Sequence, residues 1–213
     1  MSDDYNDNKT IQAQSSEVMG GGAGVNPDMD YVRPSELPVQ DLYHGHTFLT
    51  KWVFCQDAKV IGVQYFLTAV FTGVVGLILS WLMRLQLGFP GLAGFMTAEH
   101  YYQFVTMHGM IMVVYFLTAL FLGGFGNYLI PLMVGARDMV FPYVNMLSFW
   151  MFFVAVAVLM ASFFVPGGPT GSGWTLYPPQ AILEGTPGSG AGILLMLISL
   201  SLFVIGFTMG GLN

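Results

Sequence analysis

The sequence predicts an all-α membrane protein with four transmembrane helices, and three observations support this. Only 8% of the 213 residues are charged, whereas 54% are hydrophobic, and the mean hydropathy is +0.64. A soluble domain needs about a quarter charged residues to cover its surface. Four long stretches also carry no charge. Each must span as a helix, because a lone strand in lipid could not satisfy its backbone.

The expected spans follow one another along a membrane domain of residues 43–213. The first, about 61–83, is long enough at about 1.5 Å per residue to cross a hydrocarbon core of roughly 30 Å. The others run over about 104–132, 143–165 and 192–213, and Gly206 and Gly210 in the last are spaced for close helix contact. Between spans three and four, the Gly and Pro residues of "PGGPTGSGWTLYPPQAILEGTPGSG" predict an extramembrane loop.

The first 42 residues form a separate region. Eight of the twelve acidic residues lie in the first fifty positions, among Asn, Gln, Ser and Gly without apolar periodicity. We therefore expect an acidic, polar, poorly ordered tail, and it lacks the pattern of a signal peptide. The single cysteine, Cys55, excludes an internal disulfide framework and a thiolate metal cluster. Redox chemistry would therefore need a bound cofactor. Membrane lipid is an expected partner and nucleic acid is not.

Basic residues predict the orientation of the spans. Lys51 and Lys59 precede span one, and Arg137 lies between spans two and three, on the same side of the membrane. Only Arg84 lies on the other side. Positive charge is retained on the inner side, so the N-terminus is expected on the cytoplasmic or matrix side. A topology signal alone would explain Arg137 and its neighbour Asp138.

The second span carries the residues that are suited to chemistry. His108 lies inside a long apolar helix, where an ionisable group is costly and usually pairs, ligates or lines a water path. A neutral imidazole is a common haem ligand; a histidine hydrogen-bonded to a neighbouring helix is an equally good interpretation. Nineteen residues, about 28 Å of helix, separate His108 from Asn127. The histidine is thus expected near the outer face, with Asn127 and Asp138 near the inner face.

The stretch "MHGMIMVVYFLTALFLGGFGNYLIPLMVGARDMVFPYVNMLSFW" resembles the second and third helices of subunit I of the haem–copper oxygen reductases, the cytochrome c oxidase family. The resemblance extends back through "KVIGVQYFLTAVFTGVVGLILSWLMRLQL" and forward through "GWTLYPP", so it covers about 52–213. It implies the start of the twelve-helix bundle of that subunit.

The resemblance implies a haem site at the outer end of the bundle. His108 looks like one of the two axial ligands of the low-spin haem a. Arg84 looks like the arginine that hydrogen-bonds the formyl group of this haem, for which interfacial snorkelling is the alternative. Trp174 and Tyr177 are placed like residues beside the haem propionates, and membership of an interfacial aromatic belt is their alternative.

The resemblance also implies a proton pathway at the inner end. Asp138 resembles the carboxylate at the mouth of the D pathway of the family. Asn127, Asn145 and Ser148 resemble the polar groups that order water above that mouth. The topology-signal interpretation of Asp138 does not explain the two asparagines. This pattern favours the oxygen-reducing D-pathway branch over related nitric oxide reductases and cbb-type enzymes.

Two departures from the family pattern qualify these expectations. Gln86 stands where the family commonly has Glu near a structural cation, so no such cation is expected. In span four, Phe203, Gly206 and Phe207 stand where many members have serines lining the upper pathway. Proton conduction there would need waters, Thr208 or another helix.

The resemblance implies part of the catalytic subunit of a terminal respiratory oxidase that reduces oxygen to water and pumps protons. The chain ends after the fourth of about twelve spans, so the high-spin haem and copper are expected from the remaining spans of subunit I or from a second chain. Alone, these four spans cannot reduce oxygen.

The expected partners are oxidase subunits II and III, with cytochrome c or quinol as electron donor. The expected location is the bacterial cytoplasmic membrane or the mitochondrial inner membrane. The alternative function is a noncatalytic membrane scaffold or assembly subunit derived from the same fold.

Overall fold

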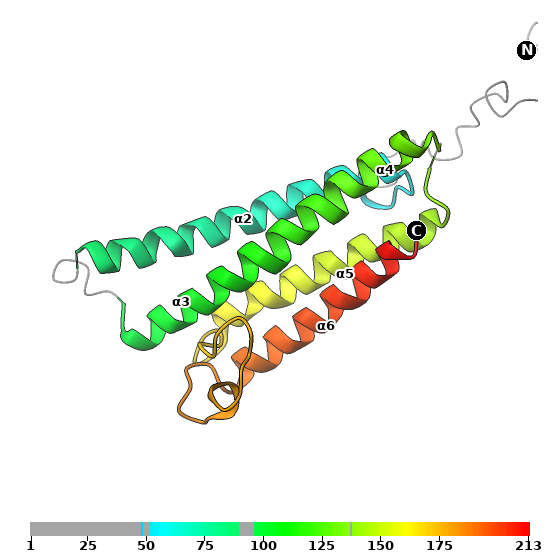
Figure 1. Ribbon diagram of the computed structural model, residues 1–213. Helices are drawn as coiled ribbons and strands as arrows, with labels where there is room; N and C mark the ends of the chain where they lie inside the picture. Colours follow the sequence, from blue (N-terminus) through cyan, green and yellow to red (C-terminus); the bar gives the residue numbers. More distant parts are fainter. Residues whose placement is uncertain (1–47, 49–51, 90–95, 137) are drawn as a thin grey trace, which may run out of the picture. The chain divides into compact units, whose positions relative to one another are not determined.

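A computed structural model describes residues 48, 52–89, 96–136 and 138–213. Within these residues, four helices are long and apolar enough to cross a membrane: Ala58–Gly88, Ala98–Val134, Pro142–Phe164 and Ala191–Gly211. Figure 1 shows them side by side. The prediction of an all-α protein with four spans is confirmed. The predicted tail of residues 1–42 lies outside the described residues, as do Lys51 and Arg137 of the orientation argument.

The first span is α2 (Ala58–Gly88). The second comprises α3 (Ala98–Met110), a π-helix η2 (Ile111–Gly126) and α4 (Asn127–Val134). The third comprises α5 (Pro142–Ala161) and the short 3-10 helix η3 (Ser162–Phe164). A second 3-10 turn, η4 (Gln180–Ile182), lies in the following loop, and α6 (Ala191–Gly211) is the fourth span.

Capping residues explain why two helices begin before the expected charge-free stretches. The side chain of Asp57 accepts a hydrogen bond from the backbone N–H of Lys59, and the hydroxyl of Thr97 accepts one from His100. Both side chains satisfy amides that a helix start leaves unpaired. Polar first turns therefore extend α2 and α3 beyond their apolar segments. At the other end of span two, α4 ends at Gly135, whose φ of 73° suits glycine.

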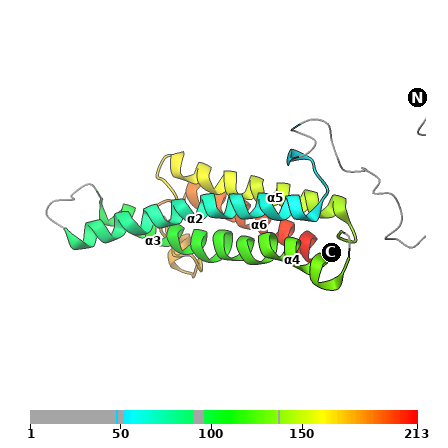
Figure 2. The same ribbon diagram turned by 90° about the horizontal axis from the view of Figure 1, so that it is seen from above.

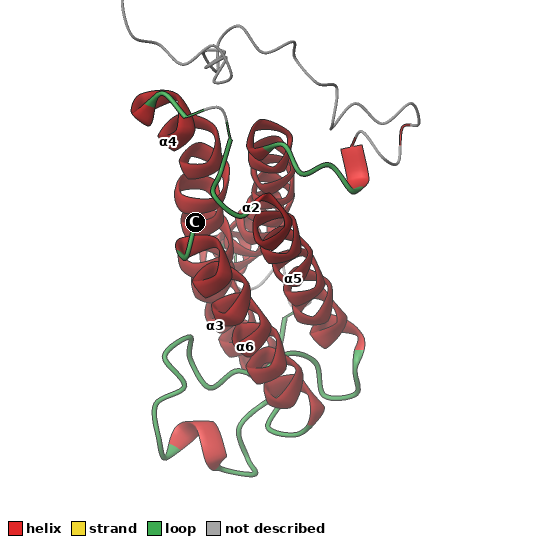
Figure 3. Ribbon diagram, turned by 90° about the vertical axis from the view of Figure 1, so that its right-hand side faces the viewer, coloured by secondary structure: helices red, strands yellow, loops and turns green. Residues whose placement is uncertain are grey.

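The bundle has two distinct ends, which Figure 3 shows clearly. At one end, here called the α4 end, Asp138 contacts the start of α2, and the Phe141 N–H donates to Asn213 Oδ1 over 2.7 Å. At the other, here called the loop end, residues 165–190 fold back on α3. There Gln103 Nε2 donates to the Gly167 carbonyl over 2.6 Å.

Glycines allow the helices to approach closely. A Cβ added at Gly62 would lie 3.0 Å from the Gly124 carbonyl oxygen, and one at Gly206 would lie 3.0 Å from the Ser148 carbonyl oxygen. The first contact joins α2 to the second span and the other joins α5 to α6. In lipid, where apolar side chains gain little by leaving their solvent, such close packing is a main source of helix association. The view from above in Figure 2 shows the four helices gathered into one bundle.

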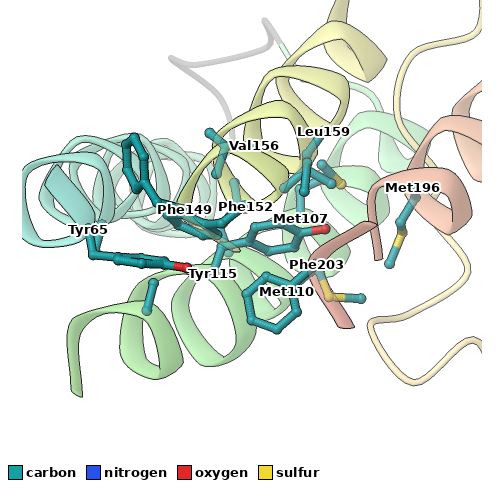
Figure 4. Packing of buried hydrophobic residues seen from close by; sticks show 14 of the residues in the cluster. Tyr65, Met107, Met110, Tyr115, Phe149, Phe152, Val156, Leu159, Met196 and Phe203 are labelled. Carbon is teal, nitrogen blue, oxygen red and sulfur yellow. The ribbon is translucent and has the colours of Figure 1, made fainter. Parts of the chain in front are cut away.

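Two tyrosine–serine hydrogen bonds cross the core between spans. Tyr65 Oη lies 3.0 Å from Ser148 Oγ, and Tyr115 Oη lies 2.5 Å from Ser199 Oγ. All four residues are almost completely buried. Around them pack the aromatic and methionine side chains shown in Figure 4. A buried hydroxyl is costly unless it is paired, so these bonds fix how the first two spans meet the last two.

Candidate functional site

His108 lies on α3 and is held by a neighbouring helix. Its Nδ1 lies 2.9 Å from the carbonyl oxygen of Gly76 on α2, and the side chain is half-buried. A carbonyl only accepts, so Nδ1 carries a proton in this contact, and in the neutral imidazole Nε2 is then the nitrogen with the lone pair. The alternative of a histidine bonded to another helix is therefore what the structure shows. It is compatible with ligation, because ligating histidines commonly donate their other N–H to a carbonyl.

The loop end brings Trp174 close to His108. A Cβ added at Gly109 would lie 3.4 Å from Trp174 Cγ, so the indole ring lies against the residue that follows the histidine. The loop is fixed there because the Gly173 N–H donates to Thr106 Oγ1 over 2.9 Å. Without a side chain at Gly109, the ring can approach the α3 backbone.

Arg84 and Tyr177 are both exposed. Arg84 is exposed on α2, eight residues beyond Gly76, which is about 12 Å along the helix. Tyr177 is 76% exposed in the loop. Among the described residues, no hydrogen bond joins either side chain to His108. The described ranges also contain no group of three or more His, Cys, Asp or Glu residues that could hold a metal ion.

The α4 end contains a cavity of about 240 Å³. A water needs only ~10–15 Å³ of such space, so several could occupy it. All four spans contribute to its wall, which is formed by Tyr65, Leu122, Gly123, Gly126, Asn127, Ile130, Met139, Ser148, Phe207, Gly210, Gly211 and Asn213. Two of the predicted site residues, Asn127 and Ser148, therefore lie on one cavity.

The predicted amides at this end differ in their hydrogen bonding. Asn127 is 7% exposed, and its Nδ2 donates to the Gly123 carbonyl over 2.7 Å. Asn145 is fully buried, and neither its Nδ2 nor its Oδ1 has a protein partner among the described residues. A buried amide normally finds ordered water when protein groups do not pair with it. The side chain of Asn145 thus suits a hydrated site.

Ser148 connects this region to the first span. Its Oγ donates to the Asn145 carbonyl over 2.6 Å, and it accepts from Tyr65 Oη at 3.0 Å. Tyr65 and Asn213 also line the cavity, and the sequence reasoning did not identify either as a site residue. Tyr65 lies within an apolar span, where a tyrosine resembles core filler. The position of Asn213 at the end of an apolar run is the only signal that could have identified it.

Asp138 lies beside the cavity, next to the lining residue Met139. Its Oδ1 accepts hydrogen bonds from the backbone N–H groups of Ala58, at 3.2 Å, and Met139, at 2.8 Å. Burial raises the pKa of the Asp138 carboxyl above its ordinary 3.8, and the nearby Asp57 adds to the rise. The two N–H donors and Lys59 lower the pKa and so oppose this effect. The carboxyl therefore holds a proton more readily than an exposed aspartate does.

The sequence matches the family described as Cytochrome C and Quinol oxidase polypeptide I over residues 60–213. Over 182 residues, 85% of this chain, it is 71% identical to the alternative cytochrome c oxidase subunit 1 of Bradyrhizobium diazoefficiens, of which it covers 31%. It is 39% identical over 163 residues, 76% of the chain, to the heme-copper oxidase subunit I+III of Aeropyrum pernix, of which it covers 20%.

A further relative is the cytochrome c oxidase subunit 1 of Eremothecium gossypii. The identity is 36% over 167 residues, which are 78% of this chain and 31% of that protein. The chain thus spans less than a third of the length of these curated relatives.

Proposed function

Because the chain belongs to the cytochrome c and quinol oxidase polypeptide I family, we propose that it is part of the catalytic subunit of a terminal respiratory oxidase. The complete enzyme reduces oxygen to water and pumps protons. Other spans of subunit I, or a second chain that carries them, supply the high-spin haem and copper. The observation that carries the proposal is the hydrogen bond between His108 Nδ1 and the Gly76 carbonyl, which fixes the ring beside a docked loop and leaves Nε2 as the nitrogen available for ligation.

The residues at the loop end fit a haem. His108 would hold the iron of the low-spin haem a through Nε2, and its bond to Gly76 would fix the orientation of the ring. Such a haem, when bound, accepts and passes single electrons. Arg84 would donate a hydrogen bond to the formyl group of the haem, and this contact would raise the reduction potential of the haem by withdrawing electron density. Trp174 and Tyr177 would lie beside the haem propionates.

The residues at the α4 end take up protons. Asp138 forms the mouth of the D pathway, where its raised pKa lets it hold a proton from the inner phase. Asn127, Asn145 and Ser148 hydrogen-bond the waters above the mouth. Amides and hydroxyls order water without trapping the proton as a second base would. Tyr65 completes this polar group through its bond to Ser148.

The α4 end faces the cytoplasm or the mitochondrial matrix, and the protein lies in the bacterial cytoplasmic membrane or the mitochondrial inner membrane. Oxidase subunits II and III are its partners, with cytochrome c or quinol as donor. Lys51, Lys59 and Arg137 fall on this side in the sequence and only Arg84 falls on the other, which supports the orientation because positive charge is retained on the inner side.

A reduced-minus-oxidised absorption spectrum of the complex purified from its native membrane tests the haem role. His108→Ala should abolish the low-spin haem band, because the iron loses an axial ligand. His100→Ala, an exposed histidine on the same helix, should leave it unchanged. A low-spin haem band that is unchanged in His108→Ala would exclude ligation of the iron by His108 and would favour a scaffold subunit built on the same fold. Intact masses of all chains would show which chain carries the other spans.

A further inference from the structure

A layer of aromatic rings begins at the cavity wall and continues along α6 toward the loop end. Phe207 of α6 lines the cavity and stacks on Phe203, with ring centroids 4.4 Å apart and an interplanar angle of 26°. Phe203 in turn lies 5.0 Å from the ring of Tyr115 on η2. Phe203 is only 5% exposed. One continuous set of rings therefore leads from the cavity wall to the buried Tyr115.

Phe152 of α5 completes this layer. Its ring centroid lies 6.0 Å from that of Phe203 and 5.9 Å from that of Phe207. It also stacks on Tyr65 at 5.2 Å, and it has no exposed surface. Figure 4 shows Phe152 near Tyr65 and Phe203 near Tyr115. We call Phe152, Phe203 and Phe207 the aromatic partition.

Matching polar groups lie on the two sides of the aromatic partition. On the cavity side, Tyr65 donates to Ser148, which donates to the Asn145 carbonyl. On the far side, Tyr115 bonds to Ser199, whose Oγ donates to the Ala155 carbonyl over 2.5 Å. The two accepting carbonyls are ten residues apart on α5, about 15 Å along the helix. Phe152 lies within that interval and presents no polar atom.

We propose that the aromatic partition excludes water between the cavity and the Tyr115–Ser199 pair. Protons then pass from the cavity toward this pair only when these rings are displaced. Apolar constrictions of this kind block conduction because water leaves them. A charge without water is also costly at this depth in the membrane. Both hydroxyl chains end on a backbone carbonyl, which cannot pass a proton on. Water must therefore bridge the gap, and the rings determine when it does.

This inference rests on the proposed role of the cavity in proton uptake, and it explains how such a cavity avoids an open leak. Phe207 is the ring to change, because it alone of the three lines the cavity. Phe207→Ser shortens the side chain and adds a hydroxyl that holds water. Phe153→Ser makes the same chemical change at an exposed ring next to Phe152 and serves as the matched control.

The first measurement is the passive proton conductance of the complex in vesicles under an imposed potential, without electron donor. Phe207→Ser should raise this conductance by roughly threefold or more, because the constriction then holds water, whereas Phe153→Ser should not raise it. The double variant Phe207→Ser/Asp138→Asn should return to the native value, since the leak starts at Asp138. A native conductance in Phe207→Ser, with an intact haem spectrum, overturns the proposal.

The second measurement does not depend on proton transfer. In a Cys55→Ser background, Ser199→Cys should react slowly with a small water-borne thiol reagent and roughly tenfold faster or more when Phe207→Ser is added, because water then reaches it. Rapid reaction with the native Phe207 overturns the aromatic partition. If Asp138→Asn alone leaves turnover unchanged, the proposed proton uptake fails, while the thiol reactivity still decides whether the rings exclude water.

Discussion

At the scale of single residues, Asp138 shows how the fold tunes an acid. It is eighty residues from Ala58, yet its carboxylate caps the first turn of α2. Burial raises its pKa, so between the ordinary 3.8 and the raised value the native state binds more protons than the unfolded state. The stability that this group contributes therefore falls as pH rises through that window.

Asp138→Asn should slow turnover by roughly 10²-fold, because an amide cannot carry the proton that a positioned carboxyl transfers. The haem spectrum should stay nearly native, since the loop end is untouched. Glu184→Gln removes a carboxyl from an exposed site at that end and should leave turnover unchanged. Oxygen consumption and proton uptake by the complex in vesicles measure both effects. Normal turnover and pumping in Asp138→Asn would exclude the assigned role.

At the scale of elements, the close packing of α6 against α5 depends on a glycine, Gly206, which has no side chain. A Cβ at Gly206 would lie 3.0 Å from the Ser148 carbonyl and 3.1 Å from Met151 Cβ, both on α5. Backbone atoms cannot move aside as a flexible side chain can. The spacing of Gly206 and Gly210 predicted close helix contact, and at Gly206 the structure shows which helix is approached.

Gly206→Ala should destabilise the bundle by about 1–3 kcal/mol, because overpacking forces α5 and α6 apart. Gly211→Ala is the matched control: nothing lies within 4 Å of its added Cβ. Alanine there should be neutral or slightly stabilising, because it favours the helix over glycine. Thermal unfolding of the purified complex, followed by circular dichroism, measures the difference. Equal Tm values for the two variants would show that the close approach at Gly206 has no energetic weight.

The positions of the helices could be predicted from the sequence more fully than the contacts between them. Charge-free stretches identify spans because lipid excludes charge locally. The charged first turn at Glu99 and His100 interrupts that signal, although the helix already includes this turn because Thr97 caps its start. Asn127, Asn145 and Ser148 could be named from a contiguous motif. The contact of Ser148 with Tyr65 could not be predicted from the sequence. The two residues are 83 positions apart, and only the packing of the helices brings them together.

At the scale of the whole molecule, polar features divide between the two ends of the bundle. The proton-accepting carboxyl and the cavity lie at the α4 end, whereas His108 and the docked loop lie toward the other. The buried core between them is mostly apolar, and its polar groups include the two hydrogen-bonded tyrosine–serine pairs. This division gives the molecule a direction across the membrane. An enzyme that takes protons from one side needs such a direction.

Cysteine labelling in right-side-out vesicles would test that direction. Val140, 72% exposed beside the α4 end, and Ile182, 76% exposed in the loop, each receive a cysteine in a Cys55→Ser background. A membrane-impermeant maleimide should label Ile182→Cys in intact vesicles and Val140→Cys only after permeabilisation, because the basic residues retain the α4 end inside. Labelling of both in detergent confirms that partner subunits cover neither. The reverse pattern would place Asp138 on the outer side, where it could not collect protons from the inner phase.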